Sequence, residues 1–352
     1  MLRYASLRLL RRPNSVNRFV FALAVLLLIF ATNLTKIRAQ NKIDFAYSAI
    51  DPAGFTGFWM ASHKNFFEQY GIAHGKVVYI SGSAVITASL MSGEITVLLA
   101  QATAPMALQA RGGDAIIFGA TENLLPYYIF LGPELKTLKD IEGKKASISR
   151  VGSGSHTSLL ALFKETGVDP KKVTFVASGD MSNRLAAFST GAVDLVGLPP
   201  PYHLRLQDKG YKISVNLLDD RVPWAQVVLA ARQSWLESNA DAAKSVLKAI
   251  AEGNYYSLTH PDEAKGLWKR YLRTTDSRIL DESFTYFRKA FVGNLVPDLK
   301  GLANVRDFGA ITPDAKGPAM APEKFVFMKP VDELIREGFF QKLAAKYNVK
   351  AR

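Results

Sequence analysis

The sequence of 352 residues contains no cysteine. This absence excludes disulfide bonds, thiolate ligands for a metal and a cysteine nucleophile. It also excludes a membrane tether through a lipid-modified cysteine. Low-complexity tracts are missing as well. With 48% hydrophobic and 21% charged residues, the composition is that of a globular protein long enough for two domains.

Patterns that carry common chemistry are also missing. The histidines at positions 63, 74, 156, 203 and 260 show no metal-binding spacing. There is no Gly-x-Ser-x-Gly elbow, and no serine, histidine and aspartate stand in contexts that favour a catalytic triad. We therefore expect a protein that is not an enzyme and that holds no metal or cofactor.

Residues 1–39 differ from the rest of the chain. They hold seven basic residues and no acidic one, arranged around an apolar run of 13 residues from Phe19 to Ala31. This pattern, with a small residue at Ala39, is typical of a signal peptide and predicts a periplasmic or other extracytoplasmic protein. An uncleaved membrane anchor is the alternative, although the run is shorter than the roughly 20 residues that span a bilayer.

The formal net charge of +13 does not indicate a nucleic-acid partner. Without residues 1–39, 37 basic residues face 31 acidic ones, which leaves about +6. The basic residues are scattered among acidic ones, whereas a nucleic-acid surface needs a clustered basic stripe.

A pattern of strand, loop, helix, glycine turn and strand occurs twice, 97 residues apart from Gly82 to Gly179. The first copy covers about 77–118 and the second about 173–215. Each copy is a βαβ unit with a further helix and strand. Two such units predict two similar α/β lobes with a ligand cleft between the strand ends.

The order of the predicted elements makes the second lobe an insertion in the first. We place the two crossings near Phe130-Leu131 and Pro223-Trp224. The predicted domains are a signal peptide (1–39), lobe 1 (40–130 plus 225–352) and lobe 2 (131–224). A loop is predicted at 51–57 and a helix at 58–70. The chain after Ser234 reads as a mostly helical extension, with a loop at 301–322 and a last helix at 330–347.

Several segments resemble a known family. They are His63-Lys64-Asn65-Phe66-Phe67, Leu138-Lys139-Asp140-Ile141-Glu142-Gly143-Lys144-Lys145, Thr166-Gly167-Val168-Asp169-Pro170 and Thr190-Gly191-Ala192-Val193-Asp194. Together they resemble the nitrate/sulfonate/taurine group of ABC-transporter substrate-binding proteins, which is related to the thiamine-pyrimidine synthases. The resemblance implies a two-lobed type 2 periplasmic-binding-protein fold, a small-molecule ligand, an ABC permease as partner, and a monomer.

The segment from Gly152 to Thr157 is the main candidate for ligand binding. It lies between a predicted strand and a helix, where unpaired amides and the helix dipole favour an anion. The hydroxyl groups of Ser155 and Thr157 add possible donors, and His156 can donate a hydrogen bond. The alternative is a plain helix cap formed by Ser155 or Thr157.

Further candidates lie where other predicted strands end, after a proline run, or at a crossing between the lobes. The full set of predicted ligand contacts is Thr56, Ser81, Gln101, Thr103, Gly152, Ser153, Gly154, Ser155, His156, Thr157, Ser178, Tyr202 and Trp224. Capping and turn formation explain the serines equally well.

We therefore expect an extracytoplasmic solute-binding protein that captures a small anionic or polar organic ligand and delivers it to a permease. Sulfonates, carboxylates, nitrate and pyrimidines are the ligand types that the resemblance implies. One alternative is an enzyme similar to the thiamine-pyrimidine synthases, which the lack of cysteine disfavours. The other is a sensor module of the same fold that keeps the N-terminal segment as an anchor.

Overall fold

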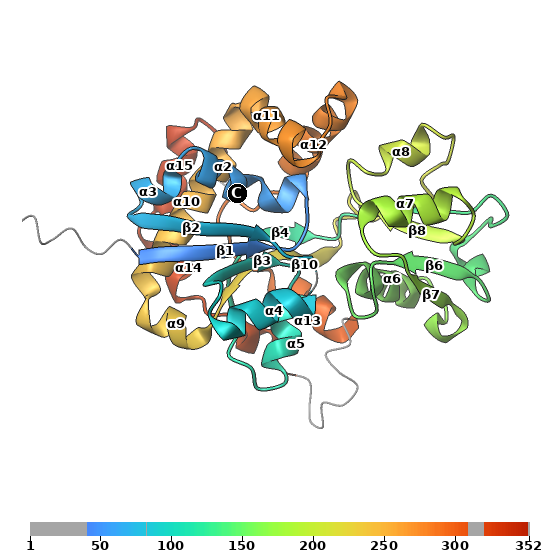
Figure 1. Ribbon diagram of the computed structural model, residues 1–352, viewed down its shortest axis with the longest axis horizontal. Helices are drawn as coiled ribbons and strands as arrows, with labels where there is room; N and C mark the ends of the chain where they lie inside the picture. Colours follow the sequence, from blue (N-terminus) through green and yellow to red (C-terminus); the bar gives the residue numbers. More distant parts are fainter. Residues whose placement is uncertain (1–40, 82, 309–319, 351–352) are drawn as a thin grey trace, which may run out of the picture. The chain divides into compact units, whose positions relative to one another are not determined.

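The computed structural model describes residues 41–81, 83–308 and 320–350, and the predicted signal peptide lies outside them. The described chain forms two five-stranded sheets with helices around them (Figure 1). The first sheet contains β1 (Asn41–Tyr47), β2 (Ile72–Tyr79), β3 (Val97–Ala100), β4 (Ile116–Leu124) and β10 (Pro223–Ala231). The second contains β5 (Tyr128–Leu131), β6 (Lys145–Ile148), β7 (Thr174–Ala177), β8 (Leu195–Leu198) and β9 (Val215–Asn216).

The two sheets share one design. The first has the order β2-β1-β3-β10-β4 and the second the order β7-β6-β8-β5-β9. In the first sheet β1 and β3 are parallel, and β10 runs antiparallel to β3 and β4. In the second sheet β6 is parallel to β7 and β8, and β5 runs antiparallel to β8 and β9. Along the chain, β5 of the second sheet directly follows β4 of the first, and β10 of the first directly follows β9 of the second.

The predicted α/β fold with an internal repeat is confirmed by this topology. The repeat units are β2-α4-β3-α5-β4 and β7-α7-β8-α8-β9. Their helices are α4 (Ser83–Ser92), α5 (Thr103–Gln109), α7 (Met181–Ser189) and α8 (Leu204–Gln207). Because β5 pairs with β8 and β9, we draw the proposed second lobe from Tyr128 rather than from Leu131.

The predicted loop at 51–57 is instead the start of helix α2 (Pro52–His63). Asp51 caps this helix by accepting hydrogen bonds from the amides of Ala53 and Gly54, and Pro52 occupies its first turn. The glycines serve close packing rather than a turn. A Cβ at Gly54 would overlap Val227, and one at Gly57 would overlap Asn254 of the helix that crosses α2.

The remaining helices are α3 (Phe66–Gln69), α6 (Gly154–Glu165), α9 (Gln233–Ser238), α10 (Ala240–Thr259), α11 (Pro261–Tyr271), α12 (Ser277–Ala290), α13 (Leu299–Phe308), α14 (Lys329–Arg336) and α15 (Phe339–Lys346). Helix α6 begins within the segment 152–157, which was predicted to lie between a strand and a helix. Helix α13 occupies part of the predicted 301–322 loop. The predicted last helix is interrupted at Gly338, whose φ of +65° ends one helix and starts the next.

The first sheet is covered on both faces. Phe45, Val97 and Leu99 point to a core shared with α2 and α10, whereas their neighbours Ala46 and Leu98 point to a core shared with α4, α5 and α13. The alternation follows from the pleat of the strands. In Figure 1, α2 and α10 accordingly lie on one side of this sheet and α4, α5 and α13 on the other.

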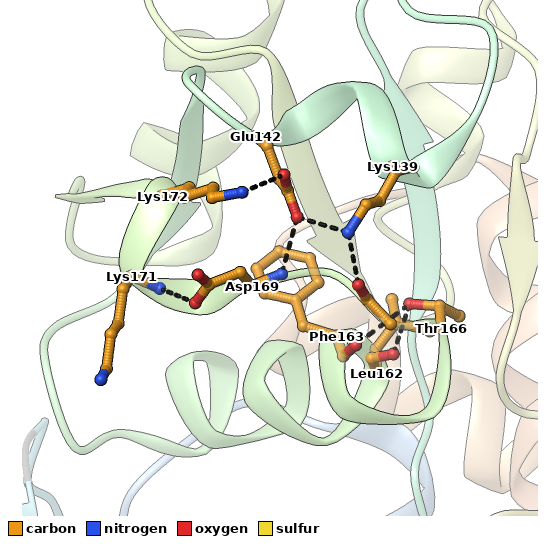
Figure 2. Close-up of polar contacts among 9 residues, drawn as sticks. Lys139, Glu142, Leu162, Phe163, Thr166, Asp169, Lys171 and Lys172 are labelled. Carbon is orange, nitrogen blue, oxygen red and sulfur yellow. Dashed lines mark hydrogen bonds and ion pairs between the residues drawn. The ribbon is translucent and has the colours of Figure 1, made fainter.

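Two of the segments that carry the family resemblance, 138–145 and 166–170, hold each other in place (Figure 2). Glu142 accepts a hydrogen bond from the amide of Asp169 (2.9 Å) and pairs with Lys139 (2.6 Å) and Lys172 (3.2 Å). Lys139 also donates to the carbonyl of Gly167. The Asp169 amide first, and then Lys139, lower the pKa of Glu142 to about 2. These motifs therefore join the segment before β6 to the turn after α6.

Candidate ligand-binding site

Helix α6 begins at the end of β6 with an ordered turn. Ser153 is the N-cap residue, and its hydroxyl accepts from the amide of His156. Gly152 has a φ of +76°, which favours glycine. The amides of Gly154 and Ser155 open the helix and have no acceptor inside it. This end of α6 thus offers donors and the positive end of a helix dipole.

The hydroxyl groups of the first turn are engaged within it. Ser155 Oγ accepts from the amide of Ser149 (2.8 Å) and contacts Ser153 Oγ (3.0 Å). Thr157 Oγ1 donates to the carbonyl of Gly154 (3.2 Å). The hydroxyls therefore stabilise the turn, and the backbone amides are the groups that remain for a ligand.

His156 has a similar local role. Its Nδ1 accepts from the amide of Gly152 (3.1 Å), and its ring stands edge-on to Phe175. Burial lowers the pKa of His156, which favours the neutral imidazole.

The two sheets come together at Gly154. An ideal Cβ at this position would overlap the side-chain amide of Gln101, which follows β3 of the first sheet. Thr103, two residues further on, is 4% exposed, and its Oγ1 has no hydrogen-bond partner. The structure thus brings the predicted residues Gln101 and Gly154 into direct contact.

A cluster centred on Tyr127 extends this contact, and the sequence interpretation missed it. The side chains of Gln226 and Gln101 lie within hydrogen-bonding reach of the Tyr127 hydroxyl. The Arg184 guanidinium lies 6.0 Å from the Tyr127 ring centroid. Burial is the main cause that raises the pKa of Tyr127, while the charge of Arg184 opposes it. One sequence signal was available: Arg184 falls in the stripe formed by Met181, Leu185 and Phe188, where helical spacing predicts apolar residues.

A buried acid cluster lies at the end of β1. The hydroxyl of Tyr286 contacts Asp51 Oδ2 (3.2 Å) and Glu122 Oε1. Burial is the main cause that raises the pKa of Asp51 to about 6 and that of Glu122 well above its usual value. Tyr202 Oη lies 3.4 Å from the carbonyl of Ile50, and burial, with Asp51 as the second cause, raises the pKa of Tyr202 to about 12.

The other predicted residues belong to other elements and have their own surroundings. Thr56 is fully buried in α2, where its hydroxyl donates to Pro52 and accepts from Trp268 Nε1 (2.8 Å). Trp224 is fully buried beside Phe308 of α13. Ser81 is exposed after β2, and Ser178 hydrogen-bonds Ser147 within the second sheet (2.9 Å). Over the described ranges, no group of three or more His, Asp or Glu side chains could hold a metal ion.

A protein-family model described as "NMT1/THI5 like" matches residues 53–264, more than half of the chain. The chain belongs to the NMT1/THI5-like family. This match covers both repeat units, Gln101, Tyr127, Gly154 and Arg184. The comparison with curated proteins finds no match.

Solved structures share the fold of this NMT1/THI5-like chain. The periplasmic aliphatic sulphonate binding protein SsuA from Escherichia coli is 18% identical, with a TM-score of 0.66, and the match covers 82% of this chain and 92% of SsuA. The periplasmic nitrate-binding protein NrtA from Synechocystis PCC 6803 is 15% identical, with a TM-score of 0.65 and coverages of 88% and 89%. The Candida albicans CA3427 gene product, described as having the generic periplasmic binding protein fold, is 16% identical, with a TM-score of 0.64 and coverages of 88% and 96%.

These matches confirm the expected family and the expected fold class. The chain has the periplasmic-binding-protein fold, built from two sheets of the same topology. In the part of the chain that the structure describes, no helix is long and apolar enough to cross a membrane.

Proposed function

We propose that this protein is the solute-binding component of an ABC import system. It captures a small organic ligand between its two lobes and presents the ligand to a permease. Support comes from membership of the NMT1/THI5-like family and from the shared fold with proteins named as sulphonate- and nitrate-binding.

The contact between Gln101 and Gly154 carries the proposal. It joins the end of β3 in one sheet to the start of α6, which follows β6 in the other sheet. In α/β proteins, ligands bind beyond the carboxyl ends of the strands, where helix N-termini and loops provide donors. Here such ends from two sheets meet, so a small ligand can contact both.

Transport follows from movement of the lobes. The chain crosses between the sheets twice, after β4 and after β9, and these two connections are the proposed hinge. Ligand that binds both lobes favours the closed arrangement, which a permease can recognise. We place the protein outside the cytoplasm as a monomer, with residues 1–39 directing its export.

A thermal-shift screen of residues 40–352 tests the proposal. The compounds are nitrate, short alkanesulfonates, aromatic carboxylates and pyrimidines, together with neutral amides of similar size. Binding to the folded state raises the melting temperature, because ligand at about 100 times its Kd adds roughly 2.7 kcal/mol of stability. We expect at least one of these compounds to give such a shift.

The matched control is Gly154→Ala. The added methyl group overlaps the Gln101 side chain, so this variant should fold but lose the shift. If no compound stabilises the wild-type chain, the proposed function is wrong. If Gly154→Ala keeps the full shift, the ligand binds elsewhere.

A further inference from the structure

Helix α7 buries a charged residue without a counter-ion. Arg184 is 2% exposed. One terminal nitrogen of its guanidinium donates to the carbonyl of Gly197, and the other lies 3.4 Å from Met181 Sδ. Its Nε has no hydrogen-bond partner. Among the described residues, no aspartate or glutamate forms an ion pair with it.

A buried charge without a counter-ion lowers the stability of the folded protein, so its presence points to a functional role. Removing a charge from water costs several kcal/mol, which is recovered only when an opposite charge and hydrogen bonds replace the water. Glu252, which is equally buried, shows the usual solution: it pairs with Lys346 and accepts from Tyr70 and Tyr347. Arg184 instead contacts the Gly197 carbonyl, the Met181 sulfur and the Tyr127 ring.

Gln226, which neighbours Tyr127, also has an unpaired polar atom. It is 5% exposed, and its Oε1 has no hydrogen-bond partner. Gln226 and Gln101 reach the hydroxyl of Tyr127, whose ring the guanidinium faces. Gln101 in turn lies against Gly154 at the start of α6.

We propose that Arg184 recognises the negative group of the ligand. This inference rests on the proposed solute-binding function and names the ligand class as a carboxylate, sulfonate or comparable oxyanion. The free Nε–H group and the planar guanidinium suit such a group, because the N–H donors match the spacing of its oxygens. Tyr127 and the two glutamines position the guanidinium and supply neutral hydrogen-bonding groups around it.

A purely structural role predicts a different outcome for Arg184→Met. If Arg184 serves to hold Gly197, the variant loses a buried bond and melts at a lower temperature. If Arg184 awaits an anion, replacing an uncompensated charge by an apolar side chain of similar length leaves the unliganded protein as stable or more stable. The control Arg336→Met removes an exposed arginine of α14, whose Nε donates to the Asp332 carbonyl within the same helix (3.4 Å).

The experiment first compares the melting temperatures of residues 40–352 and both variants in a buffer with little anion. It then measures binding of nitrate and of matched pairs, benzoate with benzamide and ethanesulfonate with ethanesulfonamide, by calorimetry. We expect the wild-type chain and Arg336→Met to bind an anion and to discriminate against its neutral partner. Arg184→Met should bind that anion about 10- to 150-fold more weakly, the loss expected for one hydrogen bond to a charged group.

The outcomes separate this inference from the proposed function. Binding of neutral compounds alone, or equal anion affinity in Arg184→Met and wild type, overturns the role of Arg184 and leaves solute binding intact. Binding of no compound at all overturns both. If Arg184→Met does not fold, Arg184→Lys is used. A folded Arg184→Lys with weakened anion binding supports recognition by the guanidinium, and unchanged affinity contradicts it.

Discussion

The residues Asp51, Tyr286 and Glu122 present two buried carboxyl groups to one phenol hydroxyl. The single hydrogen of Tyr286 can be donated to only one carboxylate at a time. Asp51 has further donors in the amides of Ala53 and Gly54, whereas Glu122 Oε2 has no partner. Glu122 is therefore the group that keeps its proton to the higher pH, and Asp51 is the one that titrates first as the pH rises.

Asp51→Asn should change how stability depends on pH. The folded pKa of Asp51, about 6, lies above its usual 3.8, so the folded state holds this proton more tightly than the unfolded state. The associated stability is fully present below pH 3.8 and is lost as the pH rises through about 6. An asparagine can still cap α2 and donate to Tyr286 Oη. Relative to wild type, the variant should gain up to about 3 kcal/mol between pH 4 and pH 7.

Urea unfolding of both proteins at several pH values measures this difference. Asp44→Asn serves as the control, since Asp44 also accepts a hydrogen bond from a backbone amide but lies near the surface. A constant difference between Asp51→Asn and wild type across this pH range would contradict the prediction.

At the residue scale, the predicted site residues differ in what the structure places around them. Gly154 and Gln101 were expected from their places after strands, and they meet in the structure. Arg184, Tyr127 and Gln226 come from three distant segments, and local patterns do not report which distant side chains share a buried space. Thr56 and Ser155 were predicted as ligand contacts from their positions in the sequence. In the structure their hydroxyl groups hydrogen-bond to nearby backbone groups, a carbonyl for Thr56 and an amide for Ser155.

Helices α2 and α10 cross so closely that glycine is required on both. An ideal Cβ on Gly253 of α10 would overlap the carbonyl oxygen of Gly57 of α2, and both atoms belong to helix backbones that have little room to move. Gly253→Ala should therefore destabilise the protein by about 1–3 kcal/mol, the usual cost of overpacking. Chemical denaturation of the unliganded protein measures this loss.

Gly266→Ala in α11 is the matched control for Gly253→Ala. Gly266 is exposed, and no atom lies within 4 Å of its ideal Cβ. Alanine there should raise stability by about 0.5–1 kcal/mol, because glycine loses more conformational freedom in a helix. If the free energy of unfolding changes in the same direction in both variants, the close crossing of α2 and α10 is not the cause of the change in Gly253→Ala.

The same crossing explains where element prediction from sequence failed. The segment 51–57 contains Pro52, Gly54 and Gly57 and therefore reads as a loop, yet it forms the first turns of α2. Proline fits the first turn, and the glycines are selected by Val227 and Asn254, which come from distant parts of the chain. By contrast, the two repeat units, which depend on local periodicity, were predicted at about 77–118 and 173–215 and are observed at 72–124 and 174–216.

At the scale of the whole molecule, the repeat predicted two similar sheets, and the topology has them. The first crossing was predicted near Phe130-Leu131, and β5 pairs with β8 from Tyr128 onward. By its sequence pattern, the apolar run from Tyr127 to Leu131 fits a strand of either sheet. Its pairing with β8 assigns it to the second sheet. Sequence reasoning therefore predicted the architecture, while pairing between distant strands set the boundary.

Helix α12 links the helices of the first sheet to the chain of the second. Arg278 binds Asp208 through both terminal nitrogens (2.7 and 2.9 Å), and Lys289 pairs with Asp219 (2.6 Å). Both acidic residues lie in the proposed second lobe. Because these pairs are exposed, each contributes at most about 1 kcal/mol. They can nevertheless favour the arrangement in which the two sheets are in contact.

Removing these pairs should weaken ligand binding without unfolding the protein. Arg278→Met and Lys289→Met should each lower the affinity for a ligand from the thermal-shift screen by up to about 5-fold, because the binding-competent arrangement becomes less populated. Raising the salt concentration should reduce the difference from wild type, since exposed ion pairs are screened. Lys265→Met is the control, because the pair of Lys265 with Asp281 joins α11 to α12 and involves no residue of the second sheet. Calorimetry at two salt concentrations measures the ligand affinity of the three variants. An equal loss of affinity in all three would assign the effect to charge alone. No loss of affinity in any of them would show that these pairs do not contribute to closure.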